Sequence, residues 1–204
     1  MKRIIVAVAL TLGLHASAQA GFAEGANAYN AKNYALALKE ITPLAKAGHA
    51  DAQHLLGLMH YMGRGVPRDP QQALAWHRKA ALQGKADAMY VIGAMYYTGN
   101  AVPQEHKEAV YWFRKAAERG HAEAQHALGL MYRYHVAGMP HDRVIAYMLF
   151  NLSAASGNKN AIEQRAAIAR QMTQEQIQEG QAMSAGWKQG TALPLKSRTG
   201  LVVS

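Results

Sequence analysis

Apolar residues recur along this chain at helical spacing, in pairs of short segments joined by polar loops. Within residues 87–97, Ala88, Ile92 and Met95 lie three or four positions apart, which places them on one side of a helix. A loop that contains glycine and proline interrupts this pattern, and residues 107–118 carry it again. The pattern therefore predicts helical hairpins.

The hairpin pattern occurs three times with a fixed period. Gly57, Gly93 and Gly129 stand 36 residues apart, each in the middle of a first helix. Glycines at equivalent places close the successive units, namely Gly48, Gly84, Gly120 and Gly157. A period of this size is typical of repeat proteins, in which stacked units share one continuous core. We therefore expect an all-α fold, an α-solenoid of stacked helix-turn-helix repeats.

Small residues predict where these helices touch. Glycine in mid-helix costs about 1 kcal/mol relative to alanine, so Gly93 implies a neighbouring helix too close for a side chain. Tryptophans at equivalent places, Trp76 and Trp112, are expected to fill the wider gaps between units, with Leu149 taking this place in the third repeat. Alanines on the second helices are expected to make the close contact: Ala73, Ala109 and Ala146.

The two ends of the chain depart from the period. Residues 1–20 are predicted to be a signal peptide, because a charged start precedes a short apolar run and the small-residue site Ala18-Gln19-Ala20. Residues 188–204 lack periodicity, and we expect a disordered tail there. Between them we expect the solenoid over 21–187, divided into an N-terminal capping hairpin (21–50), repeats (51–86, 87–122 and 123–160) and C-terminal capping helices (161–187).

Local signals refine both caps. Pro43 falls within the second helix of the first hairpin, where we expect it to kink the helix or end a turn. Thr173, with Gln176 three residues later, is expected to form a capping box that opens the last helix.

The repeats carry a family resemblance. The pattern A-x-x-x-L-G-x-x-Y-x-x-G-x-G-V, followed by Asp, Ala, Trp, Ala-Ala and Gly, resembles the Sel-one-like repeat (SLR), a relative of the tetratricopeptide repeat with a longer loop. Residues 51–84 match best, although His60 stands where the pattern prefers Tyr. The second copy has Ala101 in place of Gly65, and the third departs at His135, Leu149 and Ser153. The resemblance implies an exported bacterial scaffold that holds protein partners and has a role in envelope signalling or complex assembly.

Composition argues against several other classes of function. The chain has a net charge of +9, but basic and acidic residues are interspersed along the repeats. We assign His77-Arg78-Lys79 and Arg114-Lys115 to a solvated outer face, and we expect no nucleic-acid partner. The chain has no cysteine, which disfavours the disulfide-stapled SLR proteins linked with β-lactams.

Catalytic and metal-binding patterns were sought as well. There is no Gly-x-Ser-x-Gly elbow and no phosphate-binding loop. No two of the ten histidines are three or four residues apart, the spacing that would place two ligands on one helical face. We therefore expect no enzyme activity, no metal and no cofactor.

First helices line the concave side of stacked hairpins, so the side chains that point into it can be counted from the packed glycines. Aromatic residues and arginine at such places are the types that dominate protein interfaces. The expected binding face consists of Asp51, His54, Tyr61, Met62, Asp87, Tyr90, Tyr97, Thr98, Glu123, His126, Arg133 and Tyr134. Two local interpretations remain open: the acidic residues complement helix dipoles, and several tyrosines belong to the core.

The function expected from the sequence is a non-enzymatic periplasmic scaffold that binds a peptide or protein segment on its concave face. The alternative is a basic surface that binds anionic envelope polymer or lipid. A cell-wall or β-lactam-related enzyme ranks below both. We expect a monomer, with no stable membrane anchor once the signal is removed.

Export makes the first testable prediction. Signal peptidase should cleave after Ala20 and leave Gly21 as the mature N-terminus, because Ala18 and Ala20 fit the small subsites of the enzyme. Mass spectrometry of protein purified from the periplasmic fraction measures the terminus directly. Recovery of a chain that still begins at Met1 would contradict the prediction.

Overall fold

The computed structural model describes residues 17–199, and the helix that contains residues 17–30 begins the described part. Most of the predicted signal peptide, and residues 200–204 of the predicted tail, lie outside the described residues. The fold is all-α and built from stacked helical repeats, as expected. The chain divides into two compact units, of which unit 1 extends to Ala88 and unit 2 begins at Met89. Each unit is described by itself.

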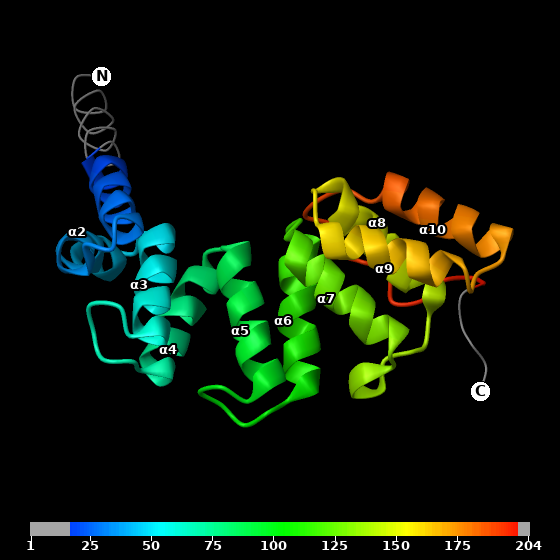
Figure 1. Ribbon diagram of the computed structural model, residues 1–204, viewed down its shortest axis with the longest axis horizontal. Helices are drawn as coiled ribbons and strands as arrows, with labels where there is room; N and C mark the ends of the chain where they lie inside the picture. Colours follow the sequence, from blue (N-terminus) through cyan, green and yellow to red (C-terminus); the bar gives the residue numbers. More distant parts are fainter. Residues whose placement is uncertain (1–16, 200–204) are drawn as a thin grey trace, which may run out of the picture. The chain divides into compact units, whose positions relative to one another are not determined.

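Unit 1 contains the N-terminal hairpin and the first full repeat, coloured blue to cyan-green in Figure 1. Helix 17–30 is followed by α2 (Tyr34–Lys46), α3 (Ala50–Met62) and α4 (Pro70–Leu82). Helix α3 packs against both α2 and α4. Pro43 lies inside α2, which continues to Lys46, so the proline does not end the helix.

Unit 2 contains most of α5 (Ala86–Thr98) and the remaining repeats. The next elements are α6 (His106–Glu118), α7 (Ala122–Arg133), the 3-10 turn η1 (Val136–Gly138), α8 (Arg143–Ala155), α9 (Lys159–Ala169) and α10 (Gln174–Gly186). Helix α8 packs against α7, α9 and α10, and the seven residues from Val144 to Phe150 are all buried. The core of unit 2 therefore centres on α8.

Side chains cap most helix starts, which explains why the helices begin where they do. Asp69 accepts a hydrogen bond from the amide of Gln72, and Thr173 forms the predicted capping box with Gln176. Two histidines act in the same way, because Nδ1 of His49 and of His121 accepts a hydrogen bond from the amide of the third helical residue, Ala52 and Ala124 respectively. These histidines are helix caps, a role that the sequence analysis did not assign.

The closest helix contacts are made by aromatic rings resting on glycine. A Cβ atom added to Gly93 would lie 2.7 Å from Cδ1 of Phe113, and one added to Gly129 would lie 2.7 Å from Cε1 of Phe150. Gly57 has the same relation to the ring of His77, at 2.8 Å from Cε1. The rings of His77, Phe113 and Phe150 therefore make this contact with the glycines. The alanines that were predicted to make it, Ala73, Ala109 and Ala146, are fully buried as well.

This contact corrects the prediction for His77. The side chain is completely buried, whereas the charge pattern had placed it on the solvated outer face with Arg78 and Lys79. Those two neighbours are exposed, as expected. The reason is the register of the repeats, since His77 stands where Phe113 and Phe150 stand in the later copies.

The tryptophans are less buried than expected. Trp76 is only partly buried, although it packs against the core cluster that contains Ile41 and Leu56. Trp112 is also partly buried, and its ring meets that of Tyr111 edge-on at 5.3 Å. Leu149, by contrast, is 1% exposed in the third repeat. The rings on glycine are therefore more deeply buried than the tryptophans.

The predicted disorder of residues 188–204 is wrong for the part that the structure describes. Residues 188–199, which we call the return segment, run back over unit 2 after α10 (red in Figure 1). Leu193 and Ser197 are buried, and hydrogen bonds join the segment to α6, α7, α10 and the start of α8. Its composition suggested disorder because the segment has no periodicity, but it is held through backbone groups that composition does not reveal.

The contact between ring and glycine leads to a packing prediction. Gly93→Ala should destabilise the protein, because overpacking costs about 1–3 kcal/mol and exceeds the gain of about 1 kcal/mol from better helix propensity. Gly186→Ala is the matched control, since nothing lies within 4 Å of its added Cβ. Thermal denaturation should show a lower Tm for Gly93→Ala and an equal or higher one for Gly186→Ala. Equal melting of the two variants would contradict the packing.

His77 leads to a prediction about pH. Burial, and then the neighbouring imidazole of His54, lower the pKa of His77 from 6.5 to about 3. Below pH 6.5 the unfolded chain therefore binds a proton at His77 that the folded chain does not bind. The contribution of His77 to the free energy of unfolding is complete above pH 6.5 and falls as the pH drops towards 3. At pH 5 the loss amounts to about 2 kcal/mol, from 1.36 kcal/mol per pH unit.

The substitution His77→Phe should remove this loss, because phenylalanine does not titrate and fills the equivalent place in the later repeats. Urea denaturation at pH 7.5 and pH 5.0 measures the difference. His135→Asn serves as the control, because His135 is exposed and Asn tolerates its positive φ of 59°. An undiminished pH dependence in His77→Phe would show that other groups cause it.

Candidate functional site

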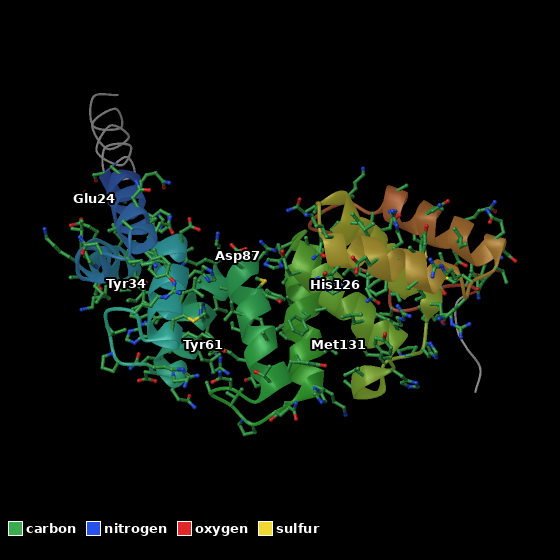
Figure 2. The ribbon with its side chains drawn as sticks, viewed as in Figure 1. Glu24, Tyr34, Tyr61, Asp87, His126 and Met131 are labelled. Atoms are coloured by element: carbon green, nitrogen blue, oxygen red, sulfur yellow. The ribbon has the colours of Figure 1, made fainter. Side chains whose placement is uncertain are left out.

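The predicted binding face falls on both units, and each part is described within its own unit. Unit 1 holds Asp51, His54, Tyr61, Met62 and Asp87. Unit 2 holds the other seven predicted residues: Tyr90, Tyr97, Thr98, Glu123, His126, Arg133 and Tyr134. Figure 2 labels Tyr61, Asp87 and His126 among them.

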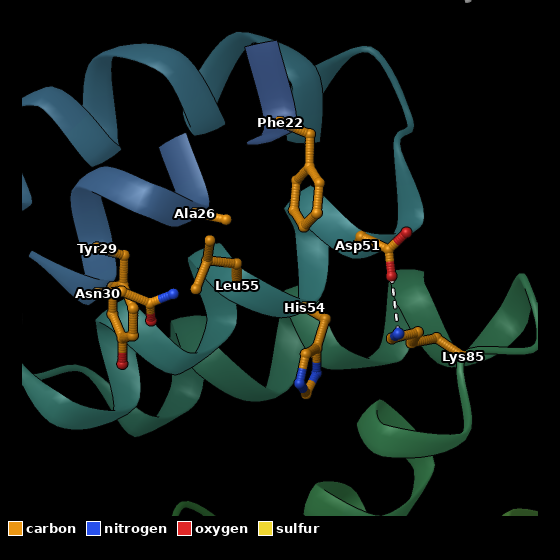
Figure 3. A pocket seen from close by; sticks show the side chains of 8 residues that line it. All are labelled: Phe22, Ala26, Tyr29, Asn30, Asp51, His54, Leu55 and Lys85. Carbon is orange, nitrogen blue, oxygen red and sulfur yellow. Dashed lines mark ion pairs between the residues drawn. The ribbon is translucent and has the colours of Figure 1, made fainter. Parts of the chain in front are cut away.

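Unit 1 has a small hollow of about 200 Å³ between helix 17–30 and α3. Two predicted residues, Asp51 and His54, lie on its wall (Figure 3). The complete lining is Phe22, Ala26, Tyr29, Asn30, Asp51, His54, Leu55 and Lys85. The hollow is smaller than most ligand pockets, which measure about 300–1,000 Å³.

The predicted acidic edge of unit 1 is occupied by a lysine. Nζ of Lys85 lies 2.7 Å from Asp51 and 2.8 Å from Asp87, and the first of these ion pairs is drawn in Figure 3. Burial opposes the charge on Lys85, but the hydrogen bonds to both carboxylates outweigh it and raise the pKa of Lys85. Lys85 stands at the repeat position of the capping histidines His49 and His121. Both carboxylates of this edge are therefore already paired with a cation within the unit.

The other predicted residues of unit 1 differ in exposure. The His54 ring packs against the buried His77 ring, with centroids 5.0 Å apart, so His54 is part of the core contact as well as the hollow. Tyr61 is half-buried, and the guanidinium of Arg68 lies 5.8 Å from the centre of its ring. Met62 is 53% exposed. Unit 1 thus offers a few separate contacts and a small hollow.

Unit 2 has a larger groove of about 490 Å³, which we call the aromatic groove. Four predicted residues line it, namely Tyr90, Tyr97, Thr98 and Tyr134. The remaining lining residues are Ala94, Phe113, Ala127, Leu130, Met131 and Val136. No charged side chain belongs to this lining, so the groove presents an apolar floor with hydroxyl groups around it.

Helical spacing builds the two walls of the aromatic groove. Tyr90, Tyr97 and Thr98 follow one face of α5, at positions i, i+7 and i+8. Leu130 and Met131 lie on α7, and Tyr134 follows directly after that helix. Met131 is labelled on α7 in Figure 2. The turn η1 adds Val136, so the groove depends on the longer loop of the third repeat.

Phe113 joins the aromatic groove to the core. Its ring rests on Gly93 and also lies 5.6 Å from the ring of Tyr90 and 6.4 Å from that of Tyr97. Tyr90 is fixed further by stacking on His121, with ring centroids 4.7 Å apart. The inner part of the groove is therefore held in place by core packing before any partner binds.

Exposure differs between the tyrosines of the aromatic groove. Tyr97 is 41% exposed and Tyr134 is 62% exposed, so both present aromatic surface to a partner. Tyr90 lies deeper, and burial, followed by the charge of Glu123, raises the pKa of Tyr90. The three tyrosines bring both ring surface and hydroxyl groups to the groove, which suits an apolar partner with hydrogen-bonding groups.

Three other predicted residues of unit 2 do not line the groove. Nη1 of Arg133 donates a hydrogen bond of 2.6 Å to Gln164 on α9, and its guanidinium lies 5.3 Å from the Tyr134 ring. His126 is half-buried, with its ring 5.8 Å from that of Phe150, and burial lowers the pKa of His126. Glu123 is exposed and lies 3.4 Å from Nδ1 of His121.

The floor of the aromatic groove was not predicted from the sequence. Ala127, Leu130 and Met131 precede Tyr134 at spacings of seven, four and three residues, which is one helical face. This spacing can be seen in the sequence. The predicted binding face, however, included only the residues six and three positions before Gly129 and four and five positions after it. Val136 could not be found in this way, because it belongs to η1 outside the helical register.

The described residues also bear on the expected absence of other chemistry. Residues 17–199 contain no group of three or more histidine or acidic side chains placed to hold a metal ion. No helix in this range has both the length and the apolar character needed to cross a membrane.

Comparison with known proteins assigns the fold to a class of helical repeat proteins. The family model of the Sel1 repeat matches residues 50–85, 86–121 and 122–158, which together make up more than half of the chain. The chain therefore belongs to the Sel1 repeat family. These boundaries agree to within two residues with the repeats predicted from the glycine period. Among curated proteins, no significant match to this chain was found.

Solved structures of similar proteins agree with this assignment. A Sel1 repeat protein from Oxalobacter formigenes is 30% identical, with a TM-score of 0.67 over 71% of this chain and 59% of that one. A protective antigen of uropathogenic Escherichia coli strains, which displays an SLR fold, is 25% identical, with a TM-score of 0.55 over 82% of this chain and 44% of its own. The chain thus spans about half the length of these two relatives.

Proposed function

We propose that this protein is a non-enzymatic periplasmic scaffold that binds a segment of a partner protein in the aromatic groove of unit 2. Sel1 repeat proteins are generally scaffolds for protein interaction, which supports the broad class. The periplasmic location rests on the predicted signal peptide. The choice of surface rests on the geometry of the groove.

One observation carries the proposal: the aromatic groove is open, uncharged and already assembled. Its volume of about 490 Å³ falls within the usual range for binding sites. Tyr97 and Tyr134 stand at its rim and Phe113 at its floor, so a partner side chain would enter between rigid aromatic rings. Tyrosines supply contact area and a hydrogen-bonding hydroxyl at low entropic cost.

The chemistry of the aromatic groove favours an apolar anchor on the partner. Because no cation lines it, an anionic polymer or phosphate would find no charge there to neutralise. A segment with one aliphatic or aromatic side chain and flanking backbone groups matches its apolar floor and hydroxyl rim. The aromatic groove therefore supports the scaffold over the anionic-polymer alternative at this surface.

The test uses peptides selected against the mature wild-type protein from a display library of random sequences. The affinity of the best synthetic peptide is then measured for Tyr97→Ala combined with Tyr134→Ala. The double variant should bind about 10- to 100-fold more weakly, as expected when interface tyrosines are truncated. Its circular dichroism and Tm should change little, because both side chains are exposed.

Tyr111→Ala provides the matched control. Tyr111 is 49% exposed on α6 and does not line the aromatic groove, so its removal should leave the affinity unchanged. The proposed site would be wrong if the double variant kept the wild-type affinity, or if Tyr111→Ala lost as much. Arg133 is left out of the test because its hydrogen bond to Gln164 makes loss of binding ambiguous.

A further inference from the structure

The return segment lies on unit 2 in the manner of a bound peptide. Its first half is held by α6, where the amide of Gly190 donates to the carbonyl of Glu118 at 2.7 Å. The amide of Leu193 donates to the carboxylate of Glu118 at 3.2 Å. Arg114 donates in return to the carbonyls of Leu193 and Pro194, at 2.7 Å and 3.3 Å. These contacts use backbone groups that any extended segment carries.

The second half of the return segment is held by α7 and by the start of α8. The Tyr132 hydroxyl donates to the carbonyl of Leu195 at 3.3 Å, and Arg114 donates to the same hydroxyl at 2.9 Å. Asp142 then accepts both the amide of Ser197, at 2.7 Å, and its hydroxyl, at 2.8 Å. Together these residues form a surface that hydrogen-bonds to backbone groups along most of the segment and to one serine side chain near its end.

The exposure of the return segment shows which of its side chains this surface contacts. Leu193 is 4% exposed and Ser197 is 7% exposed, whereas Leu195 between them is 69% exposed. Lys196 is exposed as well. The recognised pattern is therefore Leu-Pro-x-x-Ser, in which the two middle side chains point to solvent.

The polar groups that bind the return segment are held in position by the helices themselves. Asp142 is completely buried and accepts the amides of Val144 and Ile145, both at 3.0 Å, so it is fixed as the N-cap of α8. Arg114 forms an ion pair of 3.8 Å with Glu118 one turn later on α6. The recognition groups thus belong to the repeats and would stay in place without the segment.

We propose that the surface formed by Arg114, Tyr132 and Asp142 is a second peptide-binding site, which the return segment occupies in cis. The partner it fits is a protein with an extended Leu-Pro-x-x-Ser segment, which binds when the return segment leaves. The attachment allows exchange, because the segment buries one large apolar side chain, Leu193, and is held otherwise by hydrogen bonds, several of them to charged groups, which another segment of the same pattern can make equally well. A tethered occupant has an effective concentration of about millimolar, so it holds the site closed against weak partners.

The experiment uses the full chain and a labelled peptide with the sequence of residues 191–199. Leu193→Asp should release the return segment, because it puts a charge into the buried position and leaves every helix unchanged. Leu195→Asp is the matched control in the same segment, because its side chain faces solvent. Fluorescence anisotropy should show that Leu193→Asp binds the peptide at least 10-fold more tightly than either the wild type or Leu195→Asp.

Two further variants identify the site that takes the peptide. Adding Arg114→Gln to Leu193→Asp should weaken binding at least 10-fold, because it removes the donors to two carbonyls. Adding Tyr97→Ala and Tyr134→Ala should leave binding unchanged, because those residues line the aromatic groove. Failure of this proposal is thereby distinguishable from failure of the proposed function.

Several outcomes would overturn the inference. One is a Leu193→Asp protein that keeps its helical circular dichroism and binds no peptide. Another is loss of that helical signal, which would make the return segment a structural cap. Equal peptide binding by all full-length chains would exclude occupation in cis. A wild-type dimer that Leu193→Asp abolishes would make a second copy the occupant instead of a partner protein.

Discussion

Each repeat depends on the approach of an aromatic ring to the backbone of a mid-helix glycine. The added Cβ distances of 2.7–2.8 Å leave no room for any other residue at Gly57, Gly93 or Gly129 without movement of the ring. This contact sets how closely the first and second helices of a hairpin lie. In unit 2 it also sets the aromatic groove, because Phe113 covers Gly93 with one part of its ring and meets Tyr90 and Tyr97 with another. The position of Phe113 therefore determines both the packing of the hairpin core and the shape of the candidate site.

The same contact has a different cost in unit 1. His77 fills the ring position there, and neither of its ring nitrogens has a hydrogen-bond partner among the described residues. A buried polar group without a partner costs about 1–3 kcal/mol, so this repeat is less stable than one with phenylalanine. The neighbouring His54 adds a second titratable ring to the contact. The contact in unit 1 is thus less stable and depends on pH, whereas unit 2 has phenylalanine at both equivalent places.

Much of the fold could be predicted from the period of the glycines. The repeat boundaries, the Thr173–Gln176 capping box and the close packing at Gly93 all follow from local residue types and spacing. The identity of the packed ring did not follow, because a histidine between a tryptophan and two basic residues looks like part of a solvated face. Comparing His77 with Phe113 and Phe150 at the same register would have corrected this.

The candidate site was predictable only in part. Counting along α5 selected Tyr90, Tyr97 and Thr98, because a helical face is a property of spacing alone. Arg133 does not line the aromatic groove, and its hydrogen bond to Gln164 could not be predicted, because it joins residues of two different helices and no local pattern encodes it. The η1 turn and the return segment have no period at all, so their contributions to unit 2 required the structure.

The return segment also has a consequence for the order in which unit 2 forms. Helices and hairpins bring together residues that are close in the chain, and such local contacts form quickly. The hydrogen bonds that join the segment to Arg114, Tyr132 and Asp142 connect residues 55–80 positions apart, from Asp142–Ser197 to Arg114–Pro194. Arg114, Tyr132 and Asp142 come from three helices that must first be assembled before the segment has a surface to recognise. We therefore expect the segment to dock late in folding, after α6, α7 and α8 have reached their native arrangement.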